Sequence, residues 1–389
     1  MMPEGSVTPK NDSSQTKHNT SSDSGYLFLC CQHGVEPMLK RRFHDPAKGL
    51  RLAFSRPGLL TFKLPDGSLP RVPSTEDAQP AAPSTADLLA QLAADPFVRR
   101  AGVGAMQVRG ELAETLVDEA LARLGGEWND IHVFQRDPSL PGHRGFEPGQ
   151  NELTESVKAL FETRRRPDSN TGSMLGPEGS PAIERTNLAL DVVLVEPNHW
   201  LIGYHPLIAP SDRWPGGVPD IRRPENMINR AYLKMAEAIA WSQLAIRPGD
   251  QIVELGSSPG GASQRLLEIG LKVTGIDPAE MDSEVLGHPN FTHWRNKSSG
   301  VKRKLYRRFR WLAADANVAP NYTLDAVEDI VTYPTSRIEG LLLTLKLTSY
   351  DLADQLPDYL QRIAGWGYGR VEARQLATNR RELCVVAQR

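Results

Sequence analysis

The pattern of apolar positions changes near residue 224 and divides the chain into two halves. In the second half, short apolar runs alternate with stretches whose apolar residues recur at helical spacing. That alternation is typical of a parallel sheet covered by helices. The predicted strands are 251–255, 272–276, 310–314, 341–347, 371–376 and 383–387, and the predicted helices are 231–244, 261–269 and 351–364. We expect the last two strands to form a hairpin, so residues 225–389 are predicted to be one α/β domain.

The first half has the pattern of an α+β protein. Its predicted strands are 26–31, 50–54, 59–64, 131–135, 188–195 and 200–204, and its predicted helices are 36–43, 85–92 and 111–124. Turn signals at 56–58 and 196–199 favour antiparallel pairing of the short strands around them. The stretch 138–181 is rich in Gly and Pro, and no element is predicted there.

Low-complexity segments predict how the first half is organised. Residues 1–24 are rich in Ser, Thr, Asn and Asp and lack the apolar core of a secretory signal, so we expect a disordered tail. Residues 71–84 are rich in Pro, Ser and Ala and are predicted to be a linker. This linker separates a small α+β, ferredoxin-like unit over 25–70 from a second unit over 85–210.

Composition excludes several classes of protein. With 389 residues, 40% hydrophobic and 24% charged, the chain can bury a core, and no run approaches the ~18 apolar residues of a membrane span. The three cysteines, Cys30, Cys31 and Cys384, fit neither a disulfide framework nor a zinc site, and they indicate a reducing, cytoplasmic location. His288 and His293 are the nearest approach to metal-ligand spacing, and no metal site is predicted.

A glycine-rich loop between two predicted strands is the most informative segment. The loop follows the strand 251–255, and the next strand ends at Asp277, 21 residues after Gly256. Glycines let a ligand approach the backbone, and an acid at the second strand end accepts hydrogen bonds from ribose hydroxyls. Ser258 replaces a glycine of the dinucleotide fingerprint, which argues against a pyrophosphate and favours S-adenosylmethionine (SAM). We expect Glu254 to orient the loop; the alternative is a tight turn with no ligand.

The loop resembles that of the class I methyltransferases, in particular the RrmJ (FtsJ) and fibrillarin-like RNA 2'-O-methyltransferases. Their Lys-Asp-Lys-Glu tetrad is matched by Lys234, Asp315, Lys346 and Glu382. The resemblance implies a Rossmann-like domain with a mostly parallel seven-stranded sheet, SAM as the methyl donor and an RNA ribose as the acceptor. It also implies that Lys346 is the general base, with its pKa lowered by Lys234 and the sulfonium, while the two acids orient the lysines.

The chain is also similar to the large-subunit rRNA methyltransferase M group, which implies a cytidine of 23S rRNA as the target. Residues 26–42 and 226–237 resemble segments of that group, and 185–204 resembles the end of its THUMP-type RNA-binding region, so 85–210 is expected to be THUMP-like. The group's acidic pair near the adenine is replaced by Trp-Arg-Asn-Lys at 294–297, so Asn296 or the backbone is expected to contact the adenine. The expected SAM-binding residues are Glu254, Gly256, Ser257, Ser258, Pro259, Gly260, Gly261, Asp277, Asn296 and Asp315.

A basic run over residues 295–310 predicts an RNA-binding surface. It holds eight Lys or Arg residues and no acid, in a chain whose net charge is -2. The expected phosphate contacts are Arg295, Lys297, Lys302, Arg303, Lys304, Arg307 and Arg308. We expect Tyr306 and Phe309 to stack on unpaired bases. A solvated face is the alternative, and residues 164–166 are a second basic candidate.

Three other functions remain open from the sequence. An NAD-dependent oxidoreductase would need the missing glycine and a histidine for hydride transfer. A non-catalytic RNA-binding protein would not need the tetrad. A methyltransferase acting on another rRNA site or on tRNA would keep the same catalytic residues.

Overall fold

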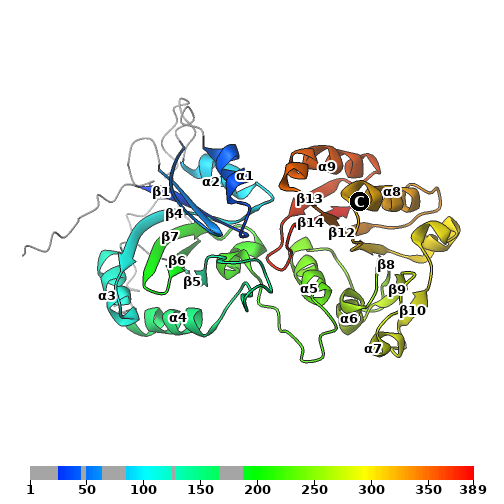
Figure 1. Ribbon diagram of the computed structural model, residues 1–389, viewed down its shortest axis with the longest axis horizontal. Coiled ribbons are helices and arrows are strands. Elements are labelled where there is room, and N and C mark those ends of the chain that lie inside the picture. Colours follow the sequence, from blue (N-terminus) through cyan, green and yellow to red (C-terminus); the bar gives the residue numbers. More distant parts are fainter. Residues whose placement is uncertain (1–24, 45–49, 64–84, 125–127, 166–186) are drawn as a thin grey trace, which may run out of the picture.

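Residues 25–44, 50–63, 85–124, 128–165 and 187–389 are described by a computed structural model (Figure 1). Within these residues the strands form two seven-stranded sheets, one in each half of the chain. The predicted tail 1–24 and linker 71–84 lie outside the described residues. No helix in the described part of the chain is long and apolar enough to cross a membrane.

The N-terminal sheet has the strand order β2-β3-β1-β4-β7-β6-β5. The strands are β1 (Tyr26–Cys31), β2 (Arg51–Arg56), β3 (Leu59–Lys63), β4 (Val98–Arg109), β5 (Asp130–Gln135), β6 (Leu188–Glu196) and β7 (His199–Pro206). The helices of this half are α1 (Glu36–Phe43), α2 (Thr85–Ala93), α3 (Ala113–Arg123) and α4 (Glu152–Arg164). Apolar side chains of α3 and α4 pack on β5, β6 and β7, and those of α1 and α2 pack on β1, β3 and β4.

This sheet corrects the prediction of two separate units. β1 lies between β3 and β4, so strands from 25–70 and from 85–210 pair in one sheet. The prediction missed β4 because Arg99, Arg100 and two glycines interrupt its apolar pattern. Gly102 is needed there, since a Cβ would lie 2.3 Å from the ring of Phe28. Pairing is antiparallel as predicted except between β5 and β6, which are parallel. The prediction also missed α4.

The C-terminal sheet has the order β10-β9-β8-β11-β12-β14-β13. Its strands are β8 (Gln251–Leu255), β9 (Lys272–Ile276), β10 (Phe291–Trp294), β11 (Trp311–Ala314), β12 (Gly340–Lys346), β13 (Arg370–Arg374) and β14 (Glu382–Gln388). The first five are parallel, and β14 is antiparallel to both β12 and β13, which confirms the predicted hairpin. The sequence reading assigned no strand to β10.

Helices cover both faces of this sheet. On one face lie α5 (Ala231–Ser242), α6 (Gly261–Glu268) and the short α7 (Ser283–Leu286); on the other lie α8 (Pro320–Val331) and α9 (Leu356–Gly365). The sequence reading missed α8. The predicted helix 351–364 is divided, because residues 350–355 form a 3-10 turn before α9 begins.

The two halves are packed against each other through a shared apolar cluster. Leu27 and Leu60 of the first half join Leu347, Leu356 and Leu383 of the second. Backbone contacts reinforce this packing, including a 2.7 Å hydrogen bond from the Gln375 amide to the Pro96 carbonyl. The C-terminal residues around β14 are therefore held partly by the N-terminal half.

Candidate active site

Four parallel strands of the C-terminal sheet end at one edge, and the predicted functional residues follow them. The carboxyl ends of parallel strands share one edge, which is where ligands bind in open α/β sheets. Gly256 follows β8, Asp277 follows β9 and Asp315 follows β11, while Lys346 is the last residue of β12. β14 runs the opposite way and brings its first residue, Glu382, to the same edge.

The four tetrad side chains meet at this edge. Lys346 Nζ lies 2.5 Å from Glu382 Oε1 and 3.4 Å from Asp315 Oδ1. Lys234, on α5, places its Nζ 2.5 Å from Glu382 Oε2 and 3.7 Å from Asp315 Oδ2. Each carboxylate is thus shared between both lysines. The four side chains are only 10–19% exposed, so these ion pairs are weakly screened by water.

The electrostatics of this cluster correct one expectation. Burial by itself lowers the pKa of Lys346, but Asp315 and Glu382 outweigh it and raise the pKa above its ordinary value of 10.5. The four side chains by themselves therefore do not give Lys346 the lowered pKa that is expected of a general base. Burial acts to raise the pKa of Glu382, and the two lysines overcome this and hold it below its usual range.

The glycine loop approaches the tetrad closely. Gly256 has φ +75°, and a Cβ there would lie 3.0 Å from the Asp315 carbonyl oxygen. Gly260 has φ +123°, and a Cβ on Gly261 would lie 2.1 Å from Asn229 Oδ1. Only glycine meets these requirements, so the loop keeps its backbone open toward the strand edge.

Asp277 holds the loop from the neighbouring strand. Its carboxylate accepts hydrogen bonds from the Ser258 amide at 3.2 Å and the Ala279 amide at 2.8 Å. The Ser258 hydroxyl donates to the Glu280 carbonyl at 2.7 Å, and the Ser257 hydroxyl lies 3.5 Å from the sulfur of Met281. These bonds join the loop and the segment after β9 into one wall of a cavity.

Two hollows open beside the loop and share part of their lining. A hollow of about 360 Å³ is bounded by Asn229, Lys234, Glu254, Ser257 and Lys346, among others. A larger one, of about 820 Å³, is bounded by Ile276, Asp277, Pro278, Asn296, Lys297, Asn317, Val318 and Tyr322, among others. Gly256, Ser258 and Asp315 line both, so Asp315 lies at the junction, and Lys234 and Lys346 line the smaller hollow beside it.

The larger hollow contains residues that the sequence reading missed. Val318 and Tyr322 are 41% and 70% exposed although they are apolar or aromatic, and both lie on its wall. They belong to the loop before α8 and to α8 itself, a helix that was not predicted. Asn296, the predicted adenine contact, lies on the same wall, and its side chain accepts from the Lys297 amide at 2.8 Å.

Two buried acids hold the elements that carry the site residues in place. Glu254 is 1% exposed and accepts a hydrogen bond from Ser263 on α6 at 2.5 Å; burial raises its pKa to about 8. Glu237, which the sequence reading did not single out, is also 1% exposed. It lies on α5 three residues after Lys234 and accepts from the Ala377 and Thr378 amides at 2.7 and 2.9 Å. It thereby ties the helix of Lys234 to the segment that leads to Glu382.

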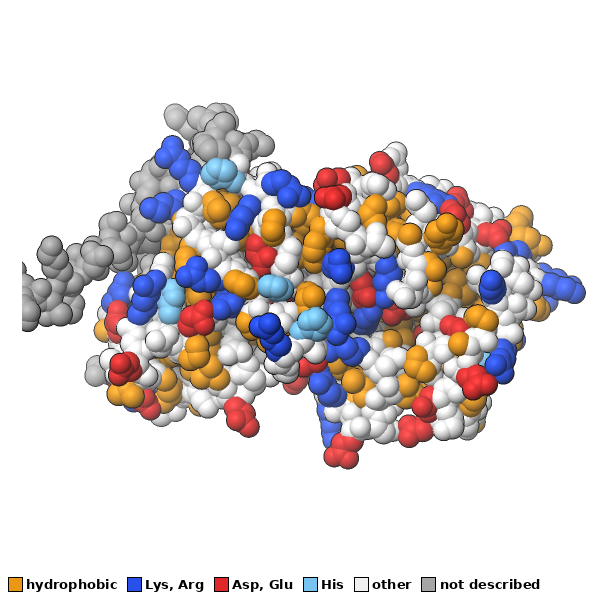
Figure 2. All heavy atoms as spheres, in the orientation of Figure 1, with side chains coloured by type: hydrophobic (Ala, Val, Ile, Leu, Met, Phe, Trp, Pro, Cys, Tyr) orange, Lys and Arg blue, Asp and Glu red, His pale blue; other side chains and the backbone are white. Residues whose placement is uncertain are grey.

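The basic run 295–310 divides into exposed and paired side chains. Arg303 is bonded to Asp329, and Arg310 lies 2.8 Å from Glu339. Arg295 lies 3.4 Å from Glu280 and is 63% exposed. The remaining exposed cations are Lys297, Lys302, Lys304, Arg307 and Arg308, of which Arg308 stacks over the rings of Trp294 and Phe309. On the face shown in Figure 2, Lys and Arg side chains also gather along the boundary between the two halves.

The predicted stacking of Tyr306 and Phe309 on bases is wrong. Each is only 1% exposed, and both rings pack edge-on against Trp294 in the core. These two buried rings anchor the basic run to the sheet. In the second basic candidate, Arg164 is paired with Asp118, and Arg165 stacks over Trp128; Arg166 lies outside the described residues.

Comparison with known proteins bears on this site. The matching family model covers the glycine loop, Lys234, Asp277 and Asp315. Residues 227–334 match the model of the FtsJ-like methyltransferase family. The resemblance read from the glycine loop is confirmed for this region. Together with the mixed sheet, the FtsJ-like domain shows the class I methyltransferase fold of the second half.

Two relatives of this chain bear the same name. A protein of Laribacter hongkongensis, "Ribosomal RNA large subunit methyltransferase M", is 30% identical over 188 residues, which are 45% of this chain and 52% of that protein. The protein of the same name from Halorhodospira halophila is 28% identical over 185 residues, 47% of this chain and 53% of its own. The chain thus matches about half the length of these relatives.

The Methanococcus jannaschii fibrillarin pre-rRNA processing protein aligns with 12% identity and a TM-score of 0.33, covering 54% of this chain and 85% of that one.

Proposed function

We propose that this protein transfers the methyl group of SAM to a ribose 2'-hydroxyl of RNA, with Lys234, Asp315, Lys346 and Glu382 as its catalytic residues. The observation that carries the proposal is the junction of the two hollows. There, Asp315 lines both hollows beside the glycine loop of the FtsJ-like domain, and each of the two lysine nitrogens lies within 3.7 Å of both carboxylates of the tetrad.

The residues around the larger hollow fit a nucleoside that carries no phosphate. Asp277 retains acceptor capacity for two ribose hydroxyls, because an ionised carboxylate can accept more than the two backbone bonds it makes here. Asn296 and Tyr322 offer an amide and an aromatic ring for an adenine. Gly256, Ser257, Ser258, Pro259, Gly260 and Gly261 supply an open backbone without a lysine for a pyrophosphate. SAM supplies an electrophilic methyl group on a positively charged sulfur.

Lys346 would accept the proton of the ribose hydroxyl as the oxygen attacks. A lysine can do this only when neutral, and the two carboxylates oppose that state. The positive charge of Lys234 and that of the bound donor act in the other direction. Asp315 and Glu382 would fix both ammonium groups at the junction, so that oxygen, methyl and sulfur are held in line.

RNA is the substrate class that the surface and the relatives favour. The exposed residues Lys297, Lys302, Lys304, Arg307 and Arg308 offer phosphate contacts on the FtsJ-like half. The relatives' name points to large-subunit ribosomal RNA. We therefore propose a cytidine of 23S rRNA as the target, a THUMP-like RNA-binding role for the first half, and a cytoplasmic location.

Transfer of a labelled methyl group tests the proposal directly. The full chain is incubated with labelled SAM and, separately, with 23S rRNA fragments, 16S rRNA and tRNA, followed by nucleoside analysis. We expect a 2'-O-methylated nucleoside in 23S rRNA and none with Lys346→Ala. Methylation of tRNA instead would show that the proposed 23S rRNA substrate is wrong. SAM binding without transfer to any RNA would contradict the enzymatic proposal.

A further inference from the structure

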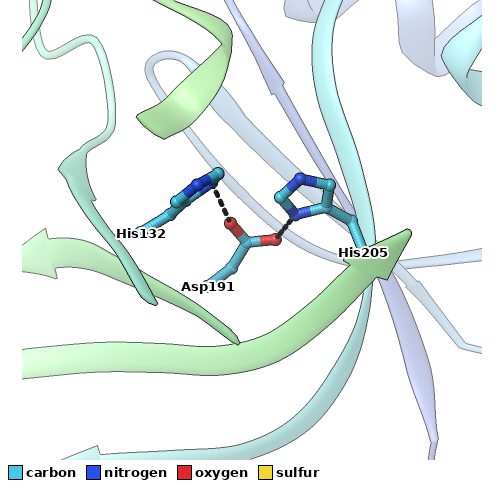
Figure 3. A group of neighbouring side chains, drawn as sticks. All are labelled: His132, Asp191 and His205. Carbon is cyan, nitrogen blue, oxygen red and sulfur yellow. Dashed lines mark hydrogen bonds and ion pairs between the residues drawn. The ribbon is translucent and has the colours of Figure 1, made fainter. Parts of the chain in front are cut away.

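A second cluster of chemistry-bearing side chains lies in the N-terminal sheet, far from the tetrad in sequence. Figure 3 shows His132 on β5, Asp191 on β6 and His205 on β7 turned toward one another. Their exposed fractions are 1%, 0% and 2%. One ligand atom from each lies within 4.8 Å of those from the other two, and this is the one such group found among the described residues.

The register of the sheet brings the three residues together. His132 lies directly opposite Asp191 in the parallel β5–β6 pair, so both side chains leave the same face. On β7, Gly203 is opposite Asp191, and His205 stands two positions further on and so on that face as well. The neighbouring positions Val133 and Val192 point the other way, into the cluster under α3 and α4.

This face leaves buried polar atoms without partners. Among the described residues, no group makes a hydrogen bond with either ring nitrogen of His132 or with Asp191 Oδ1. His132 Nδ1 and Asp191 Oδ1 face each other at 3.9 Å, too far for a hydrogen bond. His205 is fixed instead, with Nδ1 2.6 Å from Asp191 Oδ2 and Nε2 2.8 Å from the Asp212 carbonyl oxygen.

The local charge favours a cation. Asp191 is buried, and Asp130 Oδ2 lies 3.4 Å from His132 Nε2. The nearby cation, Arg100, is already bound by Asp212 at 3.0 Å and by three backbone carbonyl oxygens. Asp191 and Asp130 therefore offer, beside the two imidazoles, carboxylate oxygens that Arg100 does not bind.

We propose that His132, Asp191 and His205 bind a divalent transition-metal ion of the zinc class. Imidazole and carboxylate are ligands that Zn²⁺ accepts at about 2.0–2.2 Å, and a tetrahedral ion places its ligands about 3.3 Å apart. The three ligand atoms, which lie within 4.8 Å of one another, have to draw together by up to about 1.5 Å, and His205 has to exchange its hydrogen bond with Asp191 for the ion. The ion would link β5, β6 and β7 in the interior, and its role would be structural.

A hydrogen-bonded triad without an ion is the competing explanation. In that arrangement Asp191 and His205 form one bond, and both nitrogens of His132 stay buried without a hydrogen bond. Buried polar atoms without partners are rare in folded proteins, which is why the ion is favoured. The two explanations differ in metal content, which can be measured on the unmodified protein.

Metal binding by the tag-free full chain provides the test. The protein is stripped with a chelator, titrated with Zn²⁺ or Co²⁺, desalted and analysed by mass spectrometry of the metal. We expect about one ion per chain, the visible absorption of four-coordinate Co²⁺, and a higher melting temperature for the loaded protein. Zinc X-ray absorption should show nitrogen and oxygen ligands only.

Variants locate the ion. His132→Phe and Asp191→Asn should each weaken Zn²⁺ binding at least tenfold, whereas His143→Asn, which removes an exposed histidine, should bind like the parent protein. If the two variants do not fold, the Co²⁺ and X-ray absorption spectra of the parent still decide. The proposal would be overturned if the parent chain retains no ion or if the spectra show a sulfur ligand. An equal loss of Zn²⁺ binding in His143→Asn would also overturn it.

Discussion

Lys346 and Glu382 lie directly opposite each other on adjacent antiparallel strands, and the lysine donates a 2.5 Å hydrogen bond to the glutamate. Their separation is fixed by the β12–β14 register, because residues directly opposite in such a pair have Cβ atoms only about 5 Å apart. The pairing of two tetrad members is therefore a property of the sheet and does not depend on a loop.

Lys346→Ala should abolish methyl transfer while SAM binding survives. Removing a general base costs about 10²–10⁴ in rate, and Lys346 lies on the smaller hollow, away from Asp277. Transfer to RNA and calorimetric SAM binding are measured on the same preparation. Lys272→Ala, at an exposed position on β9, serves as the control. Comparable turnover in Lys346→Ala would remove this residue from the role of base.

The raised pKa of Lys346 also predicts how rate and stability depend on pH. The ammonium form dominates at neutral pH, so the rate of transfer should rise as the pH increases toward that pKa. The ion pairs of Lys346 stabilise the fold fully below its ordinary pKa of 10.5, and this stabilisation is lost as the pH rises through the raised value. A single-turnover rate that is flat from neutral to alkaline pH would contradict the assignment.

Glu237→Gln should slow transfer without weakening SAM binding. Glu237 accepts three hydrogen bonds from Ala377 and Thr378, and an amide cannot accept all of them without turning its NH₂ toward a donor. We expect about a tenfold lower kcat, an unchanged KM for RNA and a shifted pH profile, because Lys234 moves relative to Glu382. Glu155→Gln, at an exposed position on α4, is the control. If only the melting temperature changes, Glu237 is structural alone.

Asp277→Ala should weaken SAM binding by about 10–100-fold, which is the effect of losing hydrogen bonds to a charged group. Asp277→Asn keeps the side chain's size and one acceptor, so its loss should be smaller. Glu280→Gln lies nearby, is 84% exposed and should leave the dissociation constant unchanged. An unaltered constant in Asp277→Ala, measured by calorimetry, would show that the ribose acid has been misassigned.

Replacing Lys302 and Lys304 with Gln should weaken RNA binding and should also make the binding less sensitive to salt. Each lost phosphate contact lowers the slope of log affinity against log salt by roughly 0.7 to 0.9. Arg303→Gln, whose parent side chain is bonded to Asp329, should change the slope much less. Titrations at several salt concentrations give the slope, and equal slopes for the parent and the double variant would place RNA elsewhere.

Glu254→Gln should remove a pH dependence of stability. Burial raises the pKa of Glu254 from 4.5 to about 8, so between these values the folded state holds a proton that the unfolded state releases. The free energy of unfolding therefore falls as the pH rises from 4.5 toward 8. Melting temperatures at pH 5 and 8 should differ less in Glu254→Gln than in the parent, whereas exposed Glu155→Gln should behave like the parent. An unchanged difference in Glu254→Gln would show that Glu254 is ionised.

The sequence predicted the C-terminal half well because its signals are local. Apolar runs located β8, β9, β11, β12 and the final hairpin, and the glycine loop marked the strand edge. The match to a known tetrad then selected four residues that the structure brings together. These residues are distant in sequence, and without that resemblance Lys234, Asp315 and Glu382 look like ordinary surface charges, whereas Lys346 stands out only because it interrupts an apolar run.

The features that the sequence did not reveal depend on pairing between distant segments. β4 was missed because its glycines and arginines are explained only by contacts with Phe28 on β1 and with Asp137 in the segment after β5. Tyr306 and Phe309 were assigned to the surface because their neighbours are basic, whereas each ring points inward. The His132 cluster needs the register of three strands and has no spacing motif.

The shared apolar cluster has a consequence for any shortened form of this protein. Leu347 and Leu383 directly follow Lys346 and Glu382, and both are buried against the first half. A fragment containing only residues 225–389 would turn these leucines toward water and loosen the two strand ends that carry the charged pair. Such a fragment would tend to self-associate. A loss of activity in it would result from the missing packing of the first half and not from a missing catalytic residue.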